Sequence, residues 1–319
     1  MYAISIENDN LVWAETDDPE LEIGQVRIRV HATALNRADL VQREGGYPPP
    51  PGASPILGLE CAGEIMEVGE GVSSFQVGDA VCALLAGGGY AEQVVVPAGQ
   101  VLPVPSGLSL AEAASLPEVF ATAYLNLYME AGLQRTERVL VHAAASGVGT
   151  AAIQMCVATN NPVFVTAGSD EKVEQCIALG ADAGWNRKAG SFLEAVTRWG
   201  EVDVALDPVG ANYLADNLAC MAVDGRLALI GLLGGAQTDI NLGALLMKRV
   251  RLIGSTLRAR SVGYKSRVME GLRENVWPEI EAGNIKPVVH AVLPIAQAGQ
   301  AHALMAADEN FGKIVLSVG

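Results

Sequence analysis

Aromatic and positively charged residues are scarce in this chain of 319 residues. Phenylalanine, tryptophan and tyrosine make up 5% of it, and 21 lysines and arginines stand against 36 acidic residues, so the formal net charge is −15. A field of that sign repels nucleic acid and anionic membranes, and we expect neither as a partner. Any anionic ligand must therefore be bound by local groups.

Long apolar runs and paired cysteines are also missing. No apolar run approaches the roughly 20 residues that a membrane-spanning helix needs, and the amino terminus is unlike a signal peptide. The five cysteines are scattered, odd in number and without a CxxC pair. This pattern predicts buried, reduced thiols in a cytoplasmic protein. The 50% hydrophobic content suits a compact α/β protein.

The first third of the chain has the alternating pattern of β-strands, and from about Ser109 the period becomes helical. Pro117 is expected to break the two helices there, and the proline run Pro48–Pro51 must be a loop. The expected strands are Gln25–His31, Cys61–Val68, Ala80–Leu85 and Ala91–Val96, and the expected helices are Leu110–Leu116 and Phe120–Ala131.

Strands and helices alternate after residue 138, which predicts a parallel sheet wound on both faces. The tail beyond Leu257 is expected to hold one long helical stretch and a final strand, Lys313–Ser317. The strands expected in the alternating region are Val139–Ala143, Pro162–Ala167, Val202–Leu206, Arg226–Ile230 and Val250–Gly254. The helices expected between them are Gly147–Ala158, Glu171–Leu179, Phe192–Trp199 and Tyr213–Met221.

The segment VHAAASGVGTAAIQM, residues 141–155, has the context of a dinucleotide-binding turn, between a buried strand and a helix. Gly149 takes the third glycine position of the Gly-x-Gly-x-x-Gly pattern, while Ala144 and Ser146 replace the first two. Small residues let the backbone approach a pyrophosphate at the helix amino terminus. Ser146 adds a hydroxyl donor there, or it only caps the helix.

The next strand indicates which dinucleotide is bound. An NAD enzyme places an acidic residue on the ribose about 20 residues after the turn, but here Gly168 stands at that place. Ser169, Lys172 and Arg187 offer a hydroxyl and two cations suited to a 2′-phosphate, which favours NADPH. The alternative is that Ser169 caps a helix and Lys172 is a solvated charge beside acidic neighbours.

The chain resembles the medium-chain dehydrogenase/reductase superfamily from end to end. Within that superfamily it is most similar to the zinc-independent quinone oxidoreductases, the zeta-crystallin group, and to their tumour-suppressor-inducible branch. The stretches that carry the resemblance are LNRADLVQREGGYPPPPGASPILGLECAG (35–63), VGDAVCALLAGGGYAEQVVVP (77–97), HAAASGVGTAAIQ (142–154), TAGSDEK (166–172) and FGKIVL (311–316).

The resemblance implies a GroES-like β-rich catalytic domain, formed by residues 1–116 and 257–319, and a doubly wound Rossmann domain at residues 117–256. It implies that Asn36, Asp39 and Tyr47 line the nicotinamide and substrate pocket. Relatives commonly have tyrosine or lysine where this chain has Arg187. The predicted cofactor-binding residues are Ser146, Gly147, Val148, Gly149, Ser169, Lys172, Arg187, Gly231, Leu232, Leu233, Thr256, Leu257, Arg258 and Lys313.

The residues that bind catalytic zinc in other members of the superfamily are replaced here. Asn36 stands where zinc members have a cysteine, and Leu59 stands where they have the histidine of Gly-His-Glu. The four-cysteine lobe for a structural zinc is absent. Leucine cannot bind a cation and asparagine is a poor zinc ligand. We therefore expect no metal.

Without a metal, the chemistry must suit an acceptor that is already reactive, such as a quinone. Tyr47 either donates a hydrogen bond to the substrate carbonyl or packs against its own loop. Asn36 and Asp39, at i and i+3, share one helix face, and Asp39 acts there directly or only orients Asn36. No general acid is evident in the sequence.

Two other functions stay open: reduction of α,β-unsaturated carbonyls, and a non-enzymatic nucleotide-binding role like that of lens crystallins. Enone reduction asks more of Tyr47 or another donor, because charge develops on the substrate oxygen. The family also implies a homodimer. The predicted strand at Arg251–Ser255 is the expected contact, since an unpaired sheet edge seeks a partner.

Overall fold

The computed structural model describes all residues, 1–319, and the chain divides into two compact units. Unit 1 consists of Met1–Ala121 and Leu257–Gly319, and unit 2 is the continuous segment Thr122–Thr256. The first boundary thus lies within helix α3 (Pro117–Tyr124) rather than after Leu116. Unit 1 joins residues from both ends of the sequence into one core.

Unit 1 is built around a seven-stranded sheet in the order β14-β15-β3-β4-β5-β7, with β6 also paired to β3. Strands β1 and β2 form a separate hairpin. Its strands are β1 (Tyr2–Glu7), β2 (Asn10–Glu15), β3 (Gln25–Ala34), β4 (Glu60–Val68), β5 (Ala80–Leu84), β6 (Gln93–Pro97), β7 (Val101–Pro103), β14 (Val289–Pro294) and β15 (Lys313–Ser317). Its helices are α1 (Arg37–Arg43), α2 (Leu110–Ala113), α3 (Pro117–Tyr124), α9 (Val262–Asn275), α10 (Trp277–Glu281) and α11 (Ala298–Ala306).

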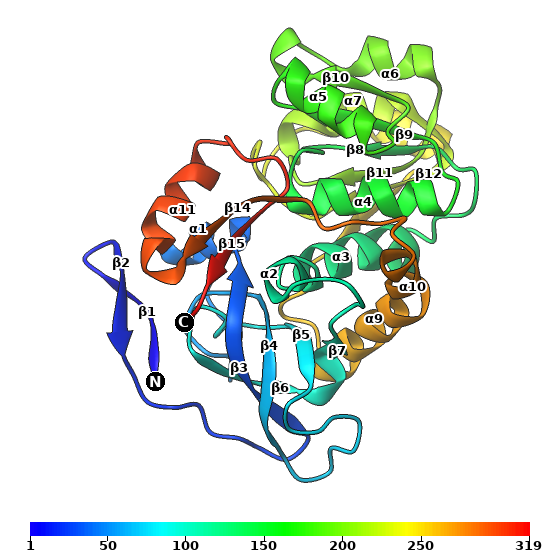
Figure 1. Ribbon diagram of the computed structural model, residues 1–319. Coiled ribbons are helices and arrows are strands. Elements are labelled where there is room, and N and C mark those ends of the chain that lie inside the picture. Colours follow the sequence, from blue (N-terminus) through cyan, green and yellow to red (C-terminus); the bar gives the residue numbers. More distant parts are fainter. The chain divides into compact units, whose positions relative to one another are not determined.

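The long strand β3 organises this sheet, and Figure 1 shows it between β15 and β4. Val26, Ile28 and Val30 alternate with more exposed residues along β3 and are 2% exposed or less. This period of two is the signature of a strand with one buried face. Strand β3 also pairs antiparallel with β15, so the last strand of the chain lies beside one of the first.

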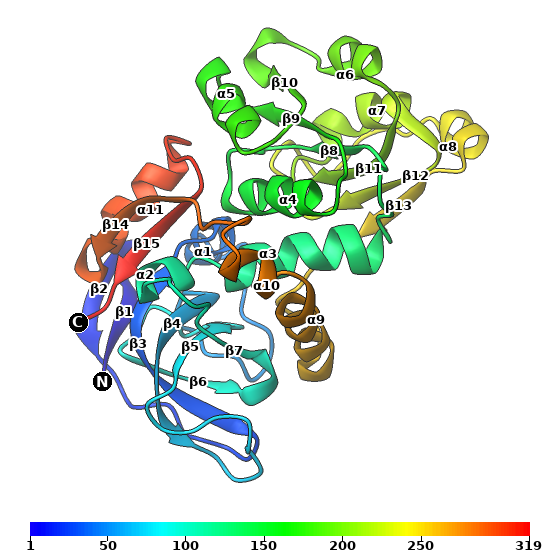
Figure 2. The same cartoon turned by 45° about the vertical axis from the view of Figure 1, so that its right-hand side comes forward.

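Unit 2 contains a six-stranded, wholly parallel sheet in the order β10-β9-β8-β11-β12-β13. Figure 2 shows α4 and α7 on opposite faces of it. Strand order reverses between β8 and β11, and ligands of such sheets bind at this switch point, beyond the carboxyl ends of the strands. The elements are β8 (Val139–Val141), α4 (Gly147–Ala158), β9 (Val163–Ala167), α5 (Asp170–Ala178), β10 (Ala183–Asn186), α6 (Leu193–Trp199), β11 (Val202–Asp207), α7 (Ala211–Cys220), β12 (Met221–Leu229), α8 (Leu242–Lys248) and β13 (Arg251–Gly254).

Pro117 separates two helices, as predicted, and it does so as the first residue of α3, because proline has no amide to lose in a first turn. Two other predictions about local structure are wrong. Residues 125–130 continue as a π-helix rather than an α-helix. The tail holds three helices and the strand β14, not one helical stretch. Helix α9 ends at Asn275, and α10 begins at Trp277 with Pro278 in its first turn.

All five cysteines are buried and unpaired, as predicted. Burial raises the pKa of the Cys156, Cys176 and Cys220 thiols to about 12, so they stay protonated and unreactive at neutral pH. None of the helices combines the length and the hydropathy that a bilayer crossing would need.

Candidate active site

The predicted phosphate turn lies at the switch point of unit 2, between β8 and α4. Ser146 is the N-cap of α4, and its Oγ accepts a hydrogen bond from the Gly149 amide at 3.1 Å. The capping role is therefore present. It does not exclude phosphate binding, because a hydroxyl whose oxygen accepts one bond still has its proton to donate. The first amides of α4 have no acceptor within the helix and point at any anion bound there.

Gly149 is required by the close packing of this helix against the turn. A Cβ at this position would lie 2.4 Å from the Ala144 carbonyl oxygen and 2.5 Å from the Ala144 Cα. These distances are far below van der Waals contact with backbone atoms, which have little freedom to move. Gly149 thus lets α4 begin close against the turn, and the binding of a pyrophosphate there stays a prediction.

The amino terminus of α5 offers the ribose end of the site. Ser169 is its N-cap, and its Oγ accepts from the Lys172 amide at 3.2 Å. The side chain of Lys172 is partly exposed in the first turn of the helix. No acidic side chain follows β9 directly, since Gly168 occupies that position. Arg187 follows β10 and is exposed.

A buried polar chain that the sequence did not reveal fixes the carboxyl end of β11. Asp207 accepts the Asn217 amide at 2.9 Å, Asn217 accepts His142 Nε2 at 2.8 Å, and His142 Nδ1 lies 2.9 Å from the Thr166 hydroxyl. Burial lowers the pKa of His142 to about 4, so the ring is neutral. Asp207 also accepts two amides of the following turn, which sets the backbone at this edge of the sheet.

The loops that follow β12 and β13 begin at the same edge of the parallel sheet, the one formed by the carboxyl ends of its strands. Gly231 is partly buried, whereas Leu232 and Leu233 are 58% and 61% exposed. Thr256 is exposed at the end of unit 2. The structure therefore gathers the predicted nucleotide-binding residues of unit 2 at one edge of its sheet. Their contacts with a nucleotide stay a prediction.

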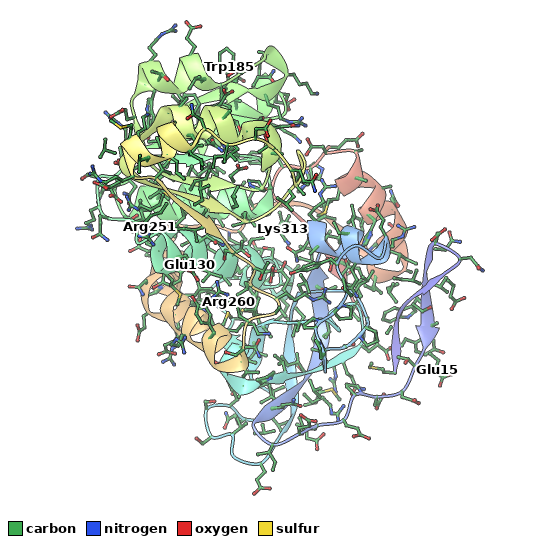
Figure 3. The ribbon with its side chains drawn as sticks, turned by 180° about the vertical axis from the view of Figure 1, so that it is seen from behind. Glu15, Glu130, Trp185, Arg251, Arg260 and Lys313 are labelled. Carbon is green, nitrogen blue, oxygen red and sulfur yellow. The ribbon has the colours of Figure 1, made fainter.

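Unit 1 holds a buried ion pair beside Asn36. The Lys313 ammonium lies 2.6 Å from Glu60 Oε1 and 2.9 Å from Asn36 Oδ1, and it also donates to the Leu35 carbonyl. Asn36 Nδ2 donates to Glu60 Oε1 at 2.9 Å. The side chain of Lys313, which Figure 3 labels, is 4% exposed.

The Lys313 ammonium has no free donor for a cofactor in this arrangement, and its predicted role in cofactor binding stays a prediction. Its three donors are already used, and a lysine has no others. No local sequence pattern indicates these contacts, because Lys313 and its partners Leu35, Asn36 and Glu60 are more than 250 positions apart. Asn36 contacts both Lys313 and Glu60 and so belongs to this buried cluster, and its predicted place in the substrate pocket stays a prediction.

The same cluster does not fit zinc. Asn36 is engaged with a lysine, Leu59 has no donor atom, and an ammonium already supplies the positive charge. The structure brings together no three histidine, cysteine, aspartate or glutamate side chains that would hold a metal ion.

Asp39 is fully buried and accepts hydrogen bonds from three neighbouring groups. Its carboxylate accepts the Asn36 amide at 2.8 Å, the Gly58 amide at 3.2 Å and the Tyr90 hydroxyl at 3.2 Å. Burial raises the pKa of Asp39 to about 6, against these hydrogen bonds. These contacts agree with the orienting role considered for Asp39, and its direct role stays a prediction.

Tyr47 lies beside a second group of charged residues in unit 1. The Arg258 guanidinium is 5.2 Å from its ring centroid, and Arg258 Nη1 donates to its carbonyl at 3.1 Å. Arg258 also donates to the Ala86 carbonyl, while its Nη2 is buried without a partner. Burial, and next the charge of Glu118, raise the pKa of Tyr47, so its hydroxyl keeps its proton at neutral pH.

Comparison with known proteins gives matches over most of the chain. The family models "Alcohol dehydrogenase GroES-like domain" and "Zinc-binding dehydrogenase" match residues 22–106 and 147–272. Quinone oxidoreductase-like protein 2 of Bos taurus is 31% identical over 317 residues, which cover 97% of this chain and 89% of that protein.

Solved structures match the whole chain. An NAD-dependent alcohol dehydrogenase superposes with a TM-score of 0.87 at 32% identity, and the CurK enoyl reductase with 0.86 at 30%; the matches cover 100% of this chain and 100% and 99% of theirs. A mycobacterial protein complexed with NADPH gives 0.87 at 29% identity, with 100% of both chains covered. These likenesses support an oxidoreductase that uses a nicotinamide cofactor.

Proposed function

Because the chain belongs to the medium-chain dehydrogenase/reductase superfamily, in its quinone oxidoreductase branch, we propose that it is an NADPH-dependent quinone reductase that needs no metal ion. One observation carries the choice of NADPH: the start of α5 presents Ser169 and Lys172 with no carboxylate directly after β9. NADPH, when bound, supplies the hydride.

Residues of unit 2 would hold the nucleotide. The amides at the start of α4 and the Ser146 hydroxyl suit the pyrophosphate, and Lys172 with Ser169 suits the 2′-phosphate. The buried series of hydrogen bonds that links Asp207, Asn217 and His142 keeps the adjacent turn in place. Rigid support of this kind is what lets a binding site hold its geometry.

Residues of unit 1 would serve the acceptor. The Tyr47 hydroxyl and the unpartnered Nη2 of Arg258 are donors suited to a quinone carbonyl oxygen, on which negative charge develops during reduction. The ammonium donors of Lys313 are already used by Glu60, Asn36 and Leu35, so we assign Lys313 no direct contact with the acceptor.

Replacement of Lys172 by alanine tests the choice of cofactor. The variant should lose on the order of tenfold or more in NADPH affinity, since a charge-assisted hydrogen bond is removed. NADH affinity should change little, because NADH has no 2′-phosphate. Fluorescence titration with both nucleotides measures this, and Lys286→Ala, an exposed lysine of unit 1, is the control. Equal losses for both nucleotides would remove Lys172 from this role.

Reduction of α,β-unsaturated carbonyls is the second candidate, and the likeness to an enoyl reductase favours it. NADPH oxidation measured with naphthoquinones and with short enals separates the two reactions. Activity on enals alone would replace the quinone proposal. Nucleotide binding without turnover on either class would instead support the non-enzymatic role.

We also propose that the protein forms homodimers through unit 2. Strand β13 is an edge of the sheet, and Figure 3 labels Arg251 on it. The neighbouring helix α8 exposes Leu242, Leu246 and Met247 at 66%, 75% and 76%. An unpaired edge next to exposed apolar side chains suits a partner. Sedimentation analysis should give twice the mass of one chain; a monomer at all concentrations would contradict this.

A further inference from the structure

The carboxyl ends of three neighbouring strands in unit 2 are joined by one series of hydrogen bonds. The strands are β9, β8 and β11, which lie side by side in the sheet (Figure 1). Thr166 comes from the end of β9, His142 directly follows β8, and Asp207 is the last residue of β11. Asn217, on α7, completes the series, and all four residues are 2% exposed or less.

These hydrogen bonds can run in one direction only. The Asp207 carboxylate only accepts, so Asn217 Nδ2 donates to it at 2.9 Å. The Oδ1 atom of Asn217 then accepts from His142 Nε2 at 2.8 Å. The ring is neutral because burial lowers the pKa of His142 to about 4, so Nδ1 accepts from the Thr166 hydroxyl at 2.9 Å. The His142 ring is therefore held by both of its nitrogens.

The next residue, Ala143, has a backbone conformation that alanine rarely adopts. Its φ is +49°, in the left-handed region, where the Cβ crowds the following carbonyl oxygen. Of the eight non-glycine residues with a positive φ, Ala143 alone is not exposed. Strained conformations of this kind persist only where the surrounding structure holds them, and they gather at functional sites. Ala143 lies in the predicted phosphate turn.

The residues on both sides of Ala143 are held by neighbouring strands. Before it, the His142 amide donates to the Leu206 carbonyl of β11 at 3.1 Å, and both ring nitrogens of His142 are bound. After it, the Ala144 amide donates to the Thr166 carbonyl of β9 at 3.0 Å. Thr166 therefore binds the chain on each side of Ala143, through its hydroxyl and through its carbonyl.

The conformation of Ala143 sets the position of the first turn of α4. Ala144 packs directly against this helix, since a Cβ on Gly149 would lie 2.4 Å from the Ala144 carbonyl oxygen. The Ser146 amide donates to the Ala143 carbonyl at 2.9 Å, which closes the turn just before the helix. A change of φ at Ala143 would therefore displace the amides that start α4, which are the groups proposed to bind the pyrophosphate.

We propose that His142 is a positioning residue for the nucleotide: it holds Ala143 in the left-handed conformation that aims the α4 amides at the pyrophosphate. This inference rests on the proposed function, since a nicotinamide dinucleotide must bind at α4. In this role His142 touches no substrate and moves no proton. It acts on affinity, and it acts equally on NADPH and NADH, because both contain the pyrophosphate. Lys172, by contrast, is proposed to contact only the 2′-phosphate.

Replacement of His142 by phenylalanine removes both ring hydrogen bonds. It keeps a ring beside Phe192 and Tyr213, whose centroids lie 4.8 and 4.7 Å from that of His142. We expect NADPH and NADH to bind about tenfold more weakly, by the same factor, since the cost of the left-handed conformation is no longer offset. Fluorescence titration measures both. Thr166→Val, which removes only the donor to Nδ1, should weaken both by a smaller factor, and it provides the same test if His142→Phe does not fold.

Rescue at Ala143 distinguishes positioning from packing. Glycine adopts a positive φ without the cost that alanine has, so Ala143→Gly added to His142→Phe should recover most of the lost affinity. The matched control is Asn160→Gly, just beyond the other end of α4, where φ is +59° and the residue is exposed. This control should recover none. If His142 only fills space, Ala143→Gly will recover no affinity either, and the positioning role is wrong.

A third measurement needs no nucleotide. Because the Ser146 amide donates to the Ala143 carbonyl, its hydrogen exchange, followed by NMR, reports on the turn in the free protein. Exchange should be about tenfold faster in His142→Phe, and it should return toward the wild-type rate when Ala143→Gly is added. An unchanged rate in His142→Phe would show that the turn does not depend on the ring and would overturn the proposal.

The outcomes separate this inference from the function it rests on. If the wild-type protein binds neither NADPH nor NADH, the proposed function fails, while the exchange of the Ser146 amide still reports on the turn. If the wild-type protein binds NADPH and His142→Phe, or Thr166→Val in its place, keeps full affinity, the proposed function stands and the role of His142 is wrong. A loss confined to NADPH would likewise contradict this role.

Discussion

Replacement of Gly149 by alanine is expected to abolish tight NADPH binding and to destabilise unit 2. The added Cβ would lie 2.4 to 2.6 Å from three backbone atoms of Ala144, so the turn or the helix must move. Overpacking of this kind typically costs about 1–3 kcal/mol in stability. Displacement of the α4 amides should weaken NADPH binding by about 100-fold or more, equivalent to about 2.7 kcal/mol.

Calorimetric titration with NADPH and urea unfolding measure the two effects. The control is Gly263→Ala in α9, where no atom lies within 4 Å of the added Cβ. Alanine is the better helix former, so this control should be neutral or slightly stabilising. Wild-type affinity and stability in Gly149→Ala would show that the phosphate turn is not packed as described.

Replacement of Lys313 by methionine should give the largest loss of stability, about 3–5 kcal/mol. The change leaves the Glu60 carboxylate without its cation at a position where its side chain is 0% exposed. A charge stranded in a dry interior costs more than the ion pair contributes when intact. Urea unfolding at pH 7 measures the loss.

A second substitution distinguishes the loss of the ion pair from the loss of side-chain packing at Lys313. Glu60→Gln combined with Lys313→Met removes both charges, and the double variant should be more stable than Lys313→Met alone. The surface pair Arg249–Asp224, with side chains 62% and 65% exposed, is the control, and Arg249→Met should have little effect. Equal losses for the buried and the exposed pair would contradict the account of Lys313.

The sequence contained most of the information on unit 2. The alternation of strands and helices predicted its parallel sheet, and helix α4 begins and ends where the turn motif placed it, at Gly147 and Ala158. Such periodicity lies within each segment, so it can be recognised without knowing which other segments that segment packs against. Strand β10 and helix α8 were missed, because they are short and weakly patterned.

The chemistry of unit 1 depended on contacts that no local pattern encodes. Lys313 and Glu60 are separated by 253 positions, and Glu118 and Glu60 by 58. Each of the three residues read alone resembles a solvated charge. Only the fold shows that one carboxyl group is paired with a lysine and that the other is not. The raised pKa of Glu118 follows from that difference.

The pairing of β15 with β3 and β14 has a consequence for biosynthesis. Unit 2 is one continuous segment, so the ribosome completes it before residue 257 is made. The edge of β3 that β15 covers stays open throughout that time, which lasts some tens of seconds at a translation rate of about 5–20 residues per second. A nascent chain with such an open edge is a natural client for chaperones until its final strand emerges.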